Sequence, residues 1–211
     1  IPALRDSKLT FYEKVMALQK DAERNKTIEY FGISDKNGMI HYADETSIFV
    51  GDRDWYKEAI KGKNFISEPL ISRTTGELQI IFSVPIYDDE HNILGVFSAT
   101  VSGLSLNDII DDIVIGETGG CYIIDASGTT IADKDIELVK KQENSIKSAI
   151  SDPELKSIAD FEQKVLESSE PGLAGFVYNG LKEIGAYSPM KTKNWKVIIS
   201  APVNELTGSL R

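Results

Sequence analysis

The residue types best suited to ligand chemistry gather in one short stretch, residues 51–59. This stretch places Arg53, Trp55 and Tyr56 within four residues, at the predicted start of a short helix for which Asp52 is a suitable N-cap. An arginine offers five N–H donors that suit a carboxylate or a pair of carbonyls, and two aromatic side chains can shield a small ligand from water. The same residues also suit a plainer role, because aromatic side chains at a helix start commonly anchor a core.

Composition limits what the rest of the chain can be. The chain has 211 residues, 41% hydrophobic and 27% charged, which suits one large globular domain or two domains of about 100 residues. A net charge of −10 without any Lys/Arg-rich run argues against a nucleic-acid partner. The single cysteine excludes an internal disulfide and leaves the compartment open, because a bacterial extracytoplasmic domain needs none. No segment approaches 18 consecutive apolar residues, so any flanking transmembrane helices are expected outside this sequence.

The hydrophobic pattern predicts the elements that would hold this stretch. Residues 4 to about 25 have the pattern of a long amphipathic helix. The period then changes from 3.6 to 2, and the strands predicted in the first half are 28–34, 39–42, 64–71, 78–87 and 93–101. Hairpin turns between successive strands indicate an antiparallel sheet flanked by helices, and therefore an α+β module.

A second copy of this pattern follows a linker at residues 116–120. Strand, Asp-x-x-Gly turn and strand recur at 121–131, and the two turn aspartates, Asp35 and Asp125, are 90 residues apart. Helices are predicted over 134–169 and three more strands near 175–177, 181–187 and 195–201. An internal duplication explains this order better than a single large fold.

Two tandem modules behind a long N-terminal helix resemble the double Cache domain, a PAS-like extracytoplasmic sensor domain of bacterial chemoreceptors, histidine kinases and cyclases. The resemblance covers nearly the whole chain, and its most specific parts are residues 52–59, 82–87, 93–97 and 119–128. The division that it implies is a dimerisation helix at 1–26, a membrane-distal ligand-binding module at 27–115, a membrane-proximal module at 116–202 and a C-terminal helix toward the membrane at 203–211.

The resemblance also implies a binding site. In the amino-acid-binding branch of the family an Arg-x-Trp-Tyr motif holds the ligand carboxylate, and Arg53, Trp55 and Tyr56 match it. The acidic residues that hold the ligand ammonium in that branch are replaced here by Ser72 and Thr100. A tyrosine expected a few residues before the arginine is also missing.

These departures change the expected ligand. A buried ammonium needs an anionic or multiply hydrogen-bonded partner, and hydroxyls are weak substitutes. The predicted ligand therefore has an anionic or acceptor-rich end and no essential ammonium, such as a small organic acid or a carbonyl-rich, nucleobase-like compound, with an amino acid as the alternative. On strand 78–87, Ser83 is the expected cavity wall and Phe82 the expected core residue, although a register slip of one would exchange them.

Other candidate residues have plainer interpretations. The two histidines, His41 and His91, lack metal-ligand spacing, and neither a phosphate loop nor a catalytic triad is suggested, so no enzyme activity, metal or cofactor is expected. Cys121 is expected to be a buried hydrophobe. Residues 73–75 suit either a cavity lip or an ordinary hairpin turn, and the turn is favoured by composition.

Two functions from different classes remain. The first is an extracytoplasmic small-molecule sensor domain of a membrane receptor, in particular a methyl-accepting chemotaxis protein, which forms a homodimer through its N-terminal helix. Its expected ligand-binding residues are Arg53, Trp55, Tyr56, Ser72, Ser83 and Thr100. The second is a dimerisation or spacer module that binds no ligand, which the missing ammonium-binding acids make worth considering.

Overall fold

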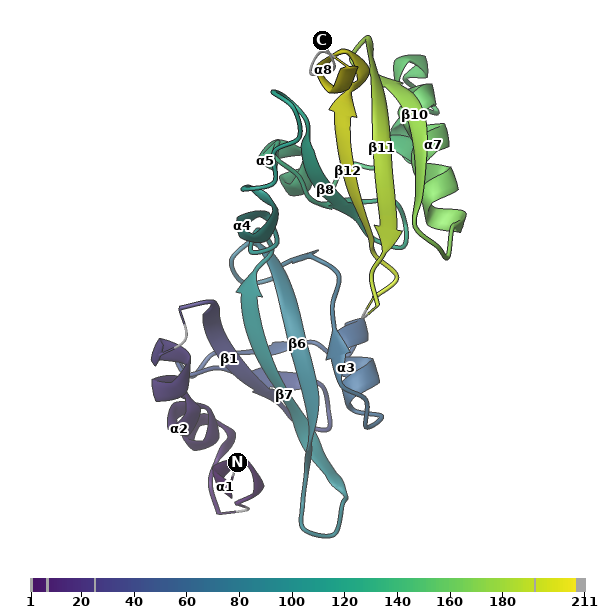
Figure 1. Cartoon of the computed structure of the whole chain (residues 1–211). Coiled ribbons are helices and arrows are strands. Elements are labelled where there is room, and N and C mark those ends of the chain that lie inside the picture. Colours follow the sequence, from purple (N-terminus) through teal and green to yellow (C-terminus); the bar gives the residue numbers. More distant parts are fainter. Residues whose placement is uncertain (1, 7, 25, 192, 208–211) are drawn as a thin grey trace. The chain divides into compact units, whose positions relative to one another are not determined.

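In the computed structural model, residues 2–6, 8–24, 26–191 and 193–207 are described, and the chain divides into two compact units, Ile1–Gly103 and Leu104–Arg211 (Figure 1). Each unit is built around its own antiparallel sheet. The strands of the first unit are β1 (Ile28–Ser34), β2 (Met39–His41), β3 (Ser47–Phe49), β4 (Phe65–Ile66), β5 (Leu70–Ile71), β6 (Leu78–Tyr87) and β7 (Ile93–Ser102). Those of the second unit are β8 (Gly120–Ile124), β9 (Thr130–Ala132), β10 (Gly172–Tyr178), β11 (Leu181–Pro189) and β12 (Lys196–Pro202).

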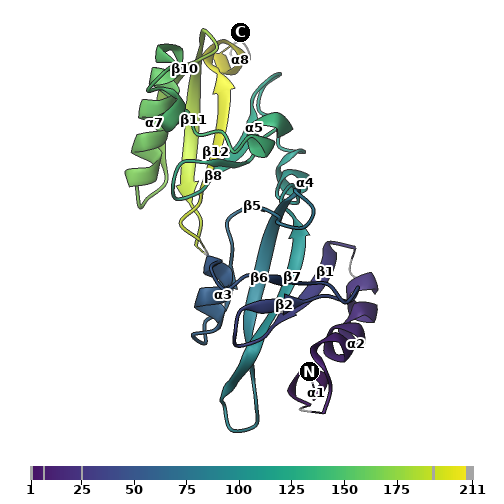
Figure 2. The ribbon, with the colours of Figure 1, turned by 180° about the vertical axis from the view of Figure 1, so that it is seen from behind.

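The two sheets share one strand order. The first runs β3-β2-β1-β7-β6-β4, with β5 also paired to β6, and the second runs β10-β11-β12-β8-β9 (Figure 2). Reading the second sheet backwards places β9, β8, β12, β11 and β10 where β2, β1, β7, β6 and β4 lie in the first. All pairings are antiparallel, which confirms the predicted α+β class with antiparallel sheets.

The repeated turns match in detail. Asp35 Oδ1 accepts backbone N–H groups two and four residues later, each at 2.9 Å, and Asp125 Oδ1 does the same at 2.8 and 3.0 Å. Gly38 and Gly128 then adopt φ angles of +82° and +83°, a region that favours glycine. The same aspartate bonding recurs at Asp88, between β6 and β7. Local sequence therefore sets the turn and with it the strand that follows.

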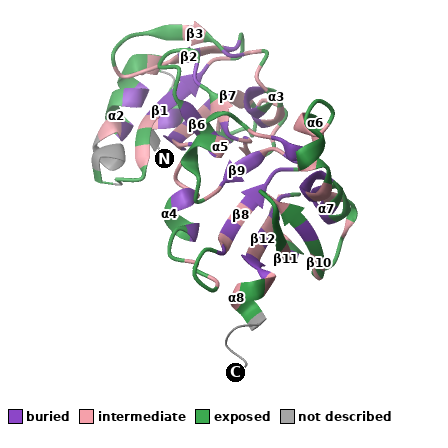
Figure 3. Ribbon diagram, turned by 90° about the horizontal axis from the view of Figure 1, so that it is seen from above, coloured by how far each residue is buried: buried purple, intermediate pink, exposed green. Residues whose placement is uncertain are grey.

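Helices cover both faces of the first sheet. One face packs its buried residues Phe31 and Ile33 against Val15 and Leu18 of α2 (Phe11–Arg24). On the other face lies α3 (Asp54–Ala59), whose buried residues include Trp55. Buried residues accordingly gather on the strands and on one side of each of these helices (Figure 3).

The second unit repeats this plan with different helices. One core lies between the sheet and α7 (Lys156–Glu167), and the other includes Ile110 of α4 (Asn107–Ile110). The remaining helical elements are α5 (Ile136–Lys140), α6 (Ser145–Ser148), η1 (Pro153–Leu155) and α8 (Val203–Thr207). The rest of the predicted C-terminal helix, residues 208–211, lies outside the described residues.

The single long N-terminal helix predicted over 1–26 is wrong. The segment forms a short α1 (Pro2–Arg5) and the 14-residue α2. The break follows from local capping. Thr10 and Glu13 form a capping box, in which Thr10 N donates to Glu13 Oε2 at 2.8 Å and Glu13 N donates to Thr10 Oγ1 at 3.2 Å. A helix that starts at this box cannot continue the helix before it.

Smaller differences have similar local causes. The predicted strand at 64–71 is two short strands, β4 and β5, on either side of Ser67 and Pro69. Residues 43–50, for which no strand is predicted, contain the short strand β3. The segment between β7 and β8 contains the short helix α4 and belongs to the second unit.

Candidate functional site

The first unit contains a small cavity beside α3, with a volume of about 30 Å³. Its lining brings together strands from across the sheet and the turn between β5 and β6. The residues are Tyr30, Ile40, Tyr42, Ile48, Val50, Arg53, Trp55, Leu70, Ser72, Arg73, Thr74, Gln79, Ile81, Ser98 and Thr100. Four of the six predicted site residues, Arg53, Trp55, Ser72 and Thr100, are therefore brought together here.

Arg53 occupies the N-cap position of α3, with extended backbone angles of −76° and 137°. The predicted cap, Asp52, lies one residue earlier. The half-buried Arg53 side chain enters the cavity lining, and its Nη2 donates to the Ile71 carbonyl oxygen at 3.2 Å. No carboxylate among the described residues pairs with it, so most of its N–H donors remain open to a ligand.

Trp55 is buried between the cavity and the core, where it packs with Val50, Ile81 and Val96. It therefore serves both as an apolar wall of the cavity and as a core anchor, the two interpretations that its sequence context allowed. Thr100 is buried on β7, directly opposite Ile81 of β6 in the sheet register. Thr100 thereby contributes a hydroxyl to the cavity lining beside the apolar Ile81.

Ser72 lines the cavity but also organises the turn that follows. Its Oγ accepts the backbone N–H groups of Thr74 and Thr75 at 3.3 and 3.2 Å. Residues 73–75 thus form a hairpin turn and also contribute to the cavity lining. The two predicted alternatives, a turn and a cavity lip, therefore both apply. A ligand at this position would meet Ser72 only by sharing that hydroxyl with the turn.

Tyr56 and Ser83 do not line the cavity. The Tyr56 hydroxyl donates to the Asp35 carbonyl oxygen at 2.9 Å, which ties α3 to the β1–β2 turn. Ser83 is buried, and its Oγ lies 3.0 Å from the Trp55 carbonyl oxygen and 3.3 Å from that of Phe65. Both side chains fix the position of α3 on the sheet. Phe82, the expected core residue, is 42% exposed on the opposite face.

The charge in the cavity is positive. Arg73 pairs with Asp52 through two hydrogen bonds of 2.8 and 2.5 Å and also donates to the Phe49 carbonyl oxygen at 3.0 Å. The hydrogen bonds from Arg73 lower the pKa of Asp52 to about 2. Burial, followed by the nearby charge of Arg73, lowers the pKa of Arg53. Of the described residues that line the cavity, none is acidic, so the arrangement favours an anion or an acceptor-rich group.

Sequence reasoning missed several polar residues of this lining. The Tyr30 hydroxyl accepts from Gln79 Nε2 at 2.6 Å, and the Tyr30 ring meets the Tyr42 ring edge-on at 5.6 Å. Ser98 Oγ lies 3.2 Å from the Gly32 carbonyl oxygen. The alternation of β1 could have identified Tyr30, but only the sheet register decides between it and Phe31. Tyr42 directly follows β2, and Gln79 and Ser98 come from strands distant in sequence.

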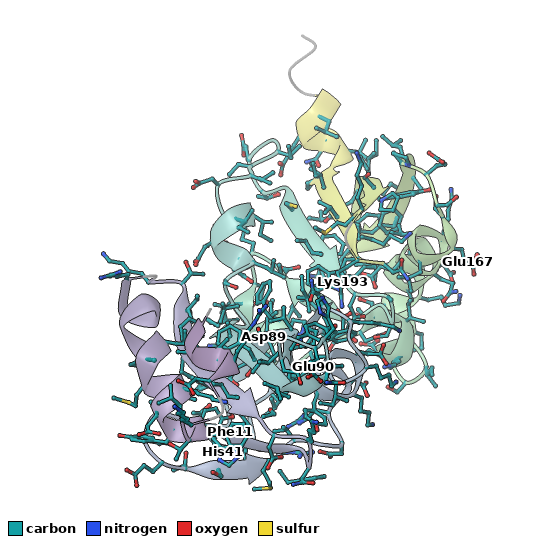
Figure 4. The ribbon with its side chains drawn as sticks, turned by 90° about the horizontal axis from the view of Figure 1, so that it is seen from below. Phe11, His41, Asp89, Glu90, Glu167 and Lys193 are labelled. Atoms are coloured by element: carbon teal, nitrogen blue, oxygen red, sulfur yellow. The ribbon has the colours of Figure 1, made fainter. Side chains whose placement is uncertain are left out.

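The histidines and the cysteine lie away from this cavity. His41 stacks on Phe11 with ring centroids 4.7 Å apart (Figure 4). His91 occupies a turn with a φ of +65°. Cys121 is buried in the core of the second unit, and burial raises its pKa. Across the described part of the chain, no group of three or more His, Cys, Asp or Glu side chains is placed to hold a metal ion.

Comparison with known proteins identifies the class. A model of the Cache domain family matches residues 5–210, so the chain belongs to the Cache domain family and the predicted resemblance is confirmed. No curated protein matches the chain significantly. Within the described residues, no helix is both long enough and apolar enough to cross a membrane.

Solved structures show the same fold at low sequence identity. The ligand-binding domain of the Campylobacter jejuni chemoreceptor Tlp3, in complex with 4-methylisoleucine, is 13% identical, with a TM-score of 0.70 over 96% of this chain and 76% of that one. The sensory domain of the same receptor with isoleucine bound is 14% identical, with a TM-score of 0.69 over 98% and 78%. The extracellular domain of the histidine-kinase candidate mmHK1S-Z3 is 12% identical, with a TM-score of 0.73 over 99% and 85%.

Proposed function

We propose that this chain is the extracytoplasmic ligand-sensing domain of a transmembrane receptor, in particular a methyl-accepting chemotaxis protein. Its first module would bind a small carboxylate or carbonyl-rich metabolite through Arg53. The observation that carries this proposal is a half-buried guanidinium in a cavity whose described lining contains no carboxylate. A ligand acceptor group would supply the partner that the cavity lacks.

The closed volume of about 30 Å³ requires the cavity to open before a metabolite enters, because that space suits little more than one water molecule. The β5–β6 turn is the part to move, since the Arg73–Asp52 pair holds it over the cavity. A ligand that binds only the open arrangement would shift the population toward it, which is how occupancy of a site becomes a signal.

Two alternatives use the same residues differently. An amino-acid sensor is favoured by the bound ligands named for Tlp3, but here hydroxyls such as Ser72 and Thr100 would have to hold the ammonium. A spacer module that binds no ligand is favoured by the small closed volume.

Dimerisation through the N-terminal segment remains part of the proposal, and sedimentation of the full chain would measure it.

The deciding experiment is a thermal-shift screen of organic acids, nucleobases and amino acids, followed by calorimetric titration of every compound that stabilises the chain. Arg53→Ala should weaken binding of the best carboxylate roughly 10- to 100-fold, as expected for loss of charge-assisted hydrogen bonds. Lys57→Ala is the matched control, because Lys57 is an exposed cation on the same helix that pairs with Asp54.

The outcomes separate the candidates. Stabilisation by organic acids that Arg53→Ala abolishes and Lys57→Ala preserves would support the proposal. Stabilisation by amino acids alone would favour the amino-acid sensor. If no compound stabilises the chain, the spacer module is favoured, and binding that survives Arg53→Ala would refute the site.

A further inference from the structure

The second unit contains a larger cavity, of about 730 Å³, that the function proposed for the first module does not use. Its walls come from β8, β10, β11, β12 and the helical segments between β9 and β10. Small-molecule sites commonly have volumes of roughly 300–1,000 Å³, so this cavity has the size of a ligand site without any rearrangement.

Glu162 is the most buried acidic residue of the lining, with 1% of its surface exposed. It belongs to the apolar face of α7, between Ile158, Phe161 and Val165. Its buried Oε2 has no hydrogen-bond partner among the described residues, and neither has the buried hydroxyl of the neighbouring Tyr122. The Tyr122 hydroxyl interacts with Glu162, so the two atoms form one polar site. A buried polar atom without a full partner is costly, and this site therefore points to a missing donor.

The charge of the lining is strongly negative. Six carboxylates contribute to it against one lysine, Lys134: Asp133, Asp135, Glu143, Asp152, Glu162 and Glu183. None of the six forms an ion pair with a described residue. Several accept hydrogen bonds from neutral groups instead, as Glu183 does from Ser200 Oγ at 2.7 Å and Glu143 does from Ser148 Oγ at 2.6 Å.

Burial changes the pKa of two of these acids, Glu162 and Asp133. It raises the pKa of Glu162 to about 7 and that of Asp133 to about 6. The hydroxyls of Ser145 and Tyr122 lie near enough to Glu162 to oppose this shift without overcoming it. A cation placed among these carboxylates would favour their ionised forms.

The lining also contains apolar and aromatic side chains beside its small polar residues, and these suit an organic cation better than a metal ion. Leu138, Leu155, Ile158 and Phe176 line the cavity together with Tyr178. The acids are also not arranged as a metal site within the described residues. Aromatic faces next to carboxylates suit an ammonium or guanidinium group on an apolar body.

We infer that the second module binds a small organic cation, a primary ammonium or guanidinium compound with an apolar body, and that Glu162 is its main anionic partner. This site is independent of Arg53 and opposite in charge to the first cavity. The chain would thereby carry two ligand sites of complementary chemistry, one in each copy of the duplicated module.

The test is calorimetric titration of the full chain at pH 8 with a panel that runs from methylammonium to 2-phenylethylammonium and phenylguanidinium. At least one cation should bind, and 2-phenylethanol, the neutral counterpart, should bind at least roughly 10-fold more weakly. Glu162→Gln should weaken the best cation roughly 10- to 100-fold, because it keeps the side-chain shape and removes the charge.

Matched controls separate this site from the first. Glu167→Gln makes the same substitution at an exposed position of the same helix, outside the cavity, and should leave cation affinity unchanged. Arg53→Ala should also leave it unchanged, so failure of the first site and failure of this one are distinguishable. Equal weakening in Glu167→Gln or Arg53→Ala would overturn the assignment to Glu162.

A second readout does not depend on the variant folding. Lowering the pH from 8 to 5.5 protonates Glu162, and wild-type affinity for the cation should fall roughly 30-fold if one carboxylate with a pKa of about 7 must be ionised. The other titratable groups of the lining are Asp133, Asp135, Glu143, Asp152, Glu183, Tyr122, Tyr178, Cys121 and Lys134. The inference is overturned if no cation of the panel binds, or if cation and neutral counterpart bind equally at both pH values.

Discussion

At the scale of single residues, neighbours in sequence have taken different roles. Arg53 and Trp55 line the first cavity, whereas Tyr56 donates its hydroxyl to the Asp35 backbone and holds α3 in place. The reason is helical geometry, since adjacent residues on a helix point about 100° apart and cannot all face one cavity. The motif predicted to bind the ligand as one unit therefore includes one residue, Tyr56, that holds α3 in place instead.

Glu162 is the opposite case. Its position in the sequence is unusual for a glutamate, although the overall composition of the chain does not reveal this. It lies four residues after Ile158 and three before Val165, on a buried stripe where a glutamate is out of place. That position alone signals a buried acid. Its environment, with unpartnered oxygen and other carboxylates nearby, comes only from the folded chain.

Glu162 should make the stability of the second module depend on pH. Burial raises its pKa from 4.5 to about 7, so the folded state binds this proton more tightly than the unfolded state. The resulting stabilisation is complete below pH 4.5 and is lost as the pH rises through about 7. Between pH 4 and pH 8 the wild type should lose about 3 kcal/mol through this group, taking about 1.4 kcal/mol per pKa unit.

Urea denaturation at the two pH values measures this effect. Glu162→Gln cannot ionise at this position, so its free energy of unfolding should fall less than that of the wild type over the same range. Glu167→Gln should behave as the wild type does. If Glu162→Gln and the wild type lost the same free energy, the carboxyl would titrate normally and the assigned pKa would be wrong.

At the scale of elements, the first cavity depends on a turn held by one ion pair. Arg73 extends from the β5–β6 turn to Asp52, just before α3, and also donates to the carbonyl oxygen of Phe49, the last residue of β3. The pair is half-exposed, with side-chain exposures of 41% and 52%, so it is a contact that ordinary fluctuations can open. We therefore expect this ion pair to act as a latch, that is, to hold the turn closed over the cavity.

Asp52→Asn should raise the affinity of the first cavity for its carboxylate ligand several-fold. Loss of the carboxylate increases the fraction of open molecules, and the apparent affinity rises with that fraction. It also frees the Arg73 charge for the ligand, which acts in the same direction. Titration of wild type and variant measures the change, with Asp54→Asn as control because Asp54 pairs with Lys57 instead. Unchanged or weaker binding in Asp52→Asn would exclude the latch.

At the scale of the whole chain, duplication is the organising fact. The same strand order, the same aspartate turn and a separate core recur in each unit, so each unit has what a domain needs to fold. The copies differ at their cavities. The first is small and lined with arginine, and the second is large and lined with acids. The two units therefore share their strand topology but differ in the residues that line their cavities.

Residues 104–211 expressed alone should fold and unfold cooperatively. Their buried clusters around Ile124 and Ile131 draw no residue from the first unit. Circular dichroism during urea denaturation would show one sigmoidal transition, and residues 1–103 provide the matching test of the other half. A featureless, gradual loss of signal from 104–211 would show that this unit needs its neighbour.

Sequence by itself determined the α+β class, the duplicated order of strands and turns, and the family. These features are local, because period-2 alternation, Asp-x-x-Gly turns and helical stripes are set by residues near one another in the chain. It also identified Arg53 as one of the two arginines that line the first cavity, and it missed the Thr10–Glu13 box that splits the N-terminal helix.

Only the tertiary structure decided which side chains share a cavity. The first cavity is lined by Arg53 together with Tyr30, Gln79 and Ser98, because β1, β6 and β7 are paired in one register. A register shift of one residue would turn the side chains of a strand to the other face of the sheet. The acidic cavity of the second unit likewise combines Glu162 of α7 with Tyr122 of β8, 40 residues earlier in the chain. Such meetings depend on long-range packing, which no local pattern encodes.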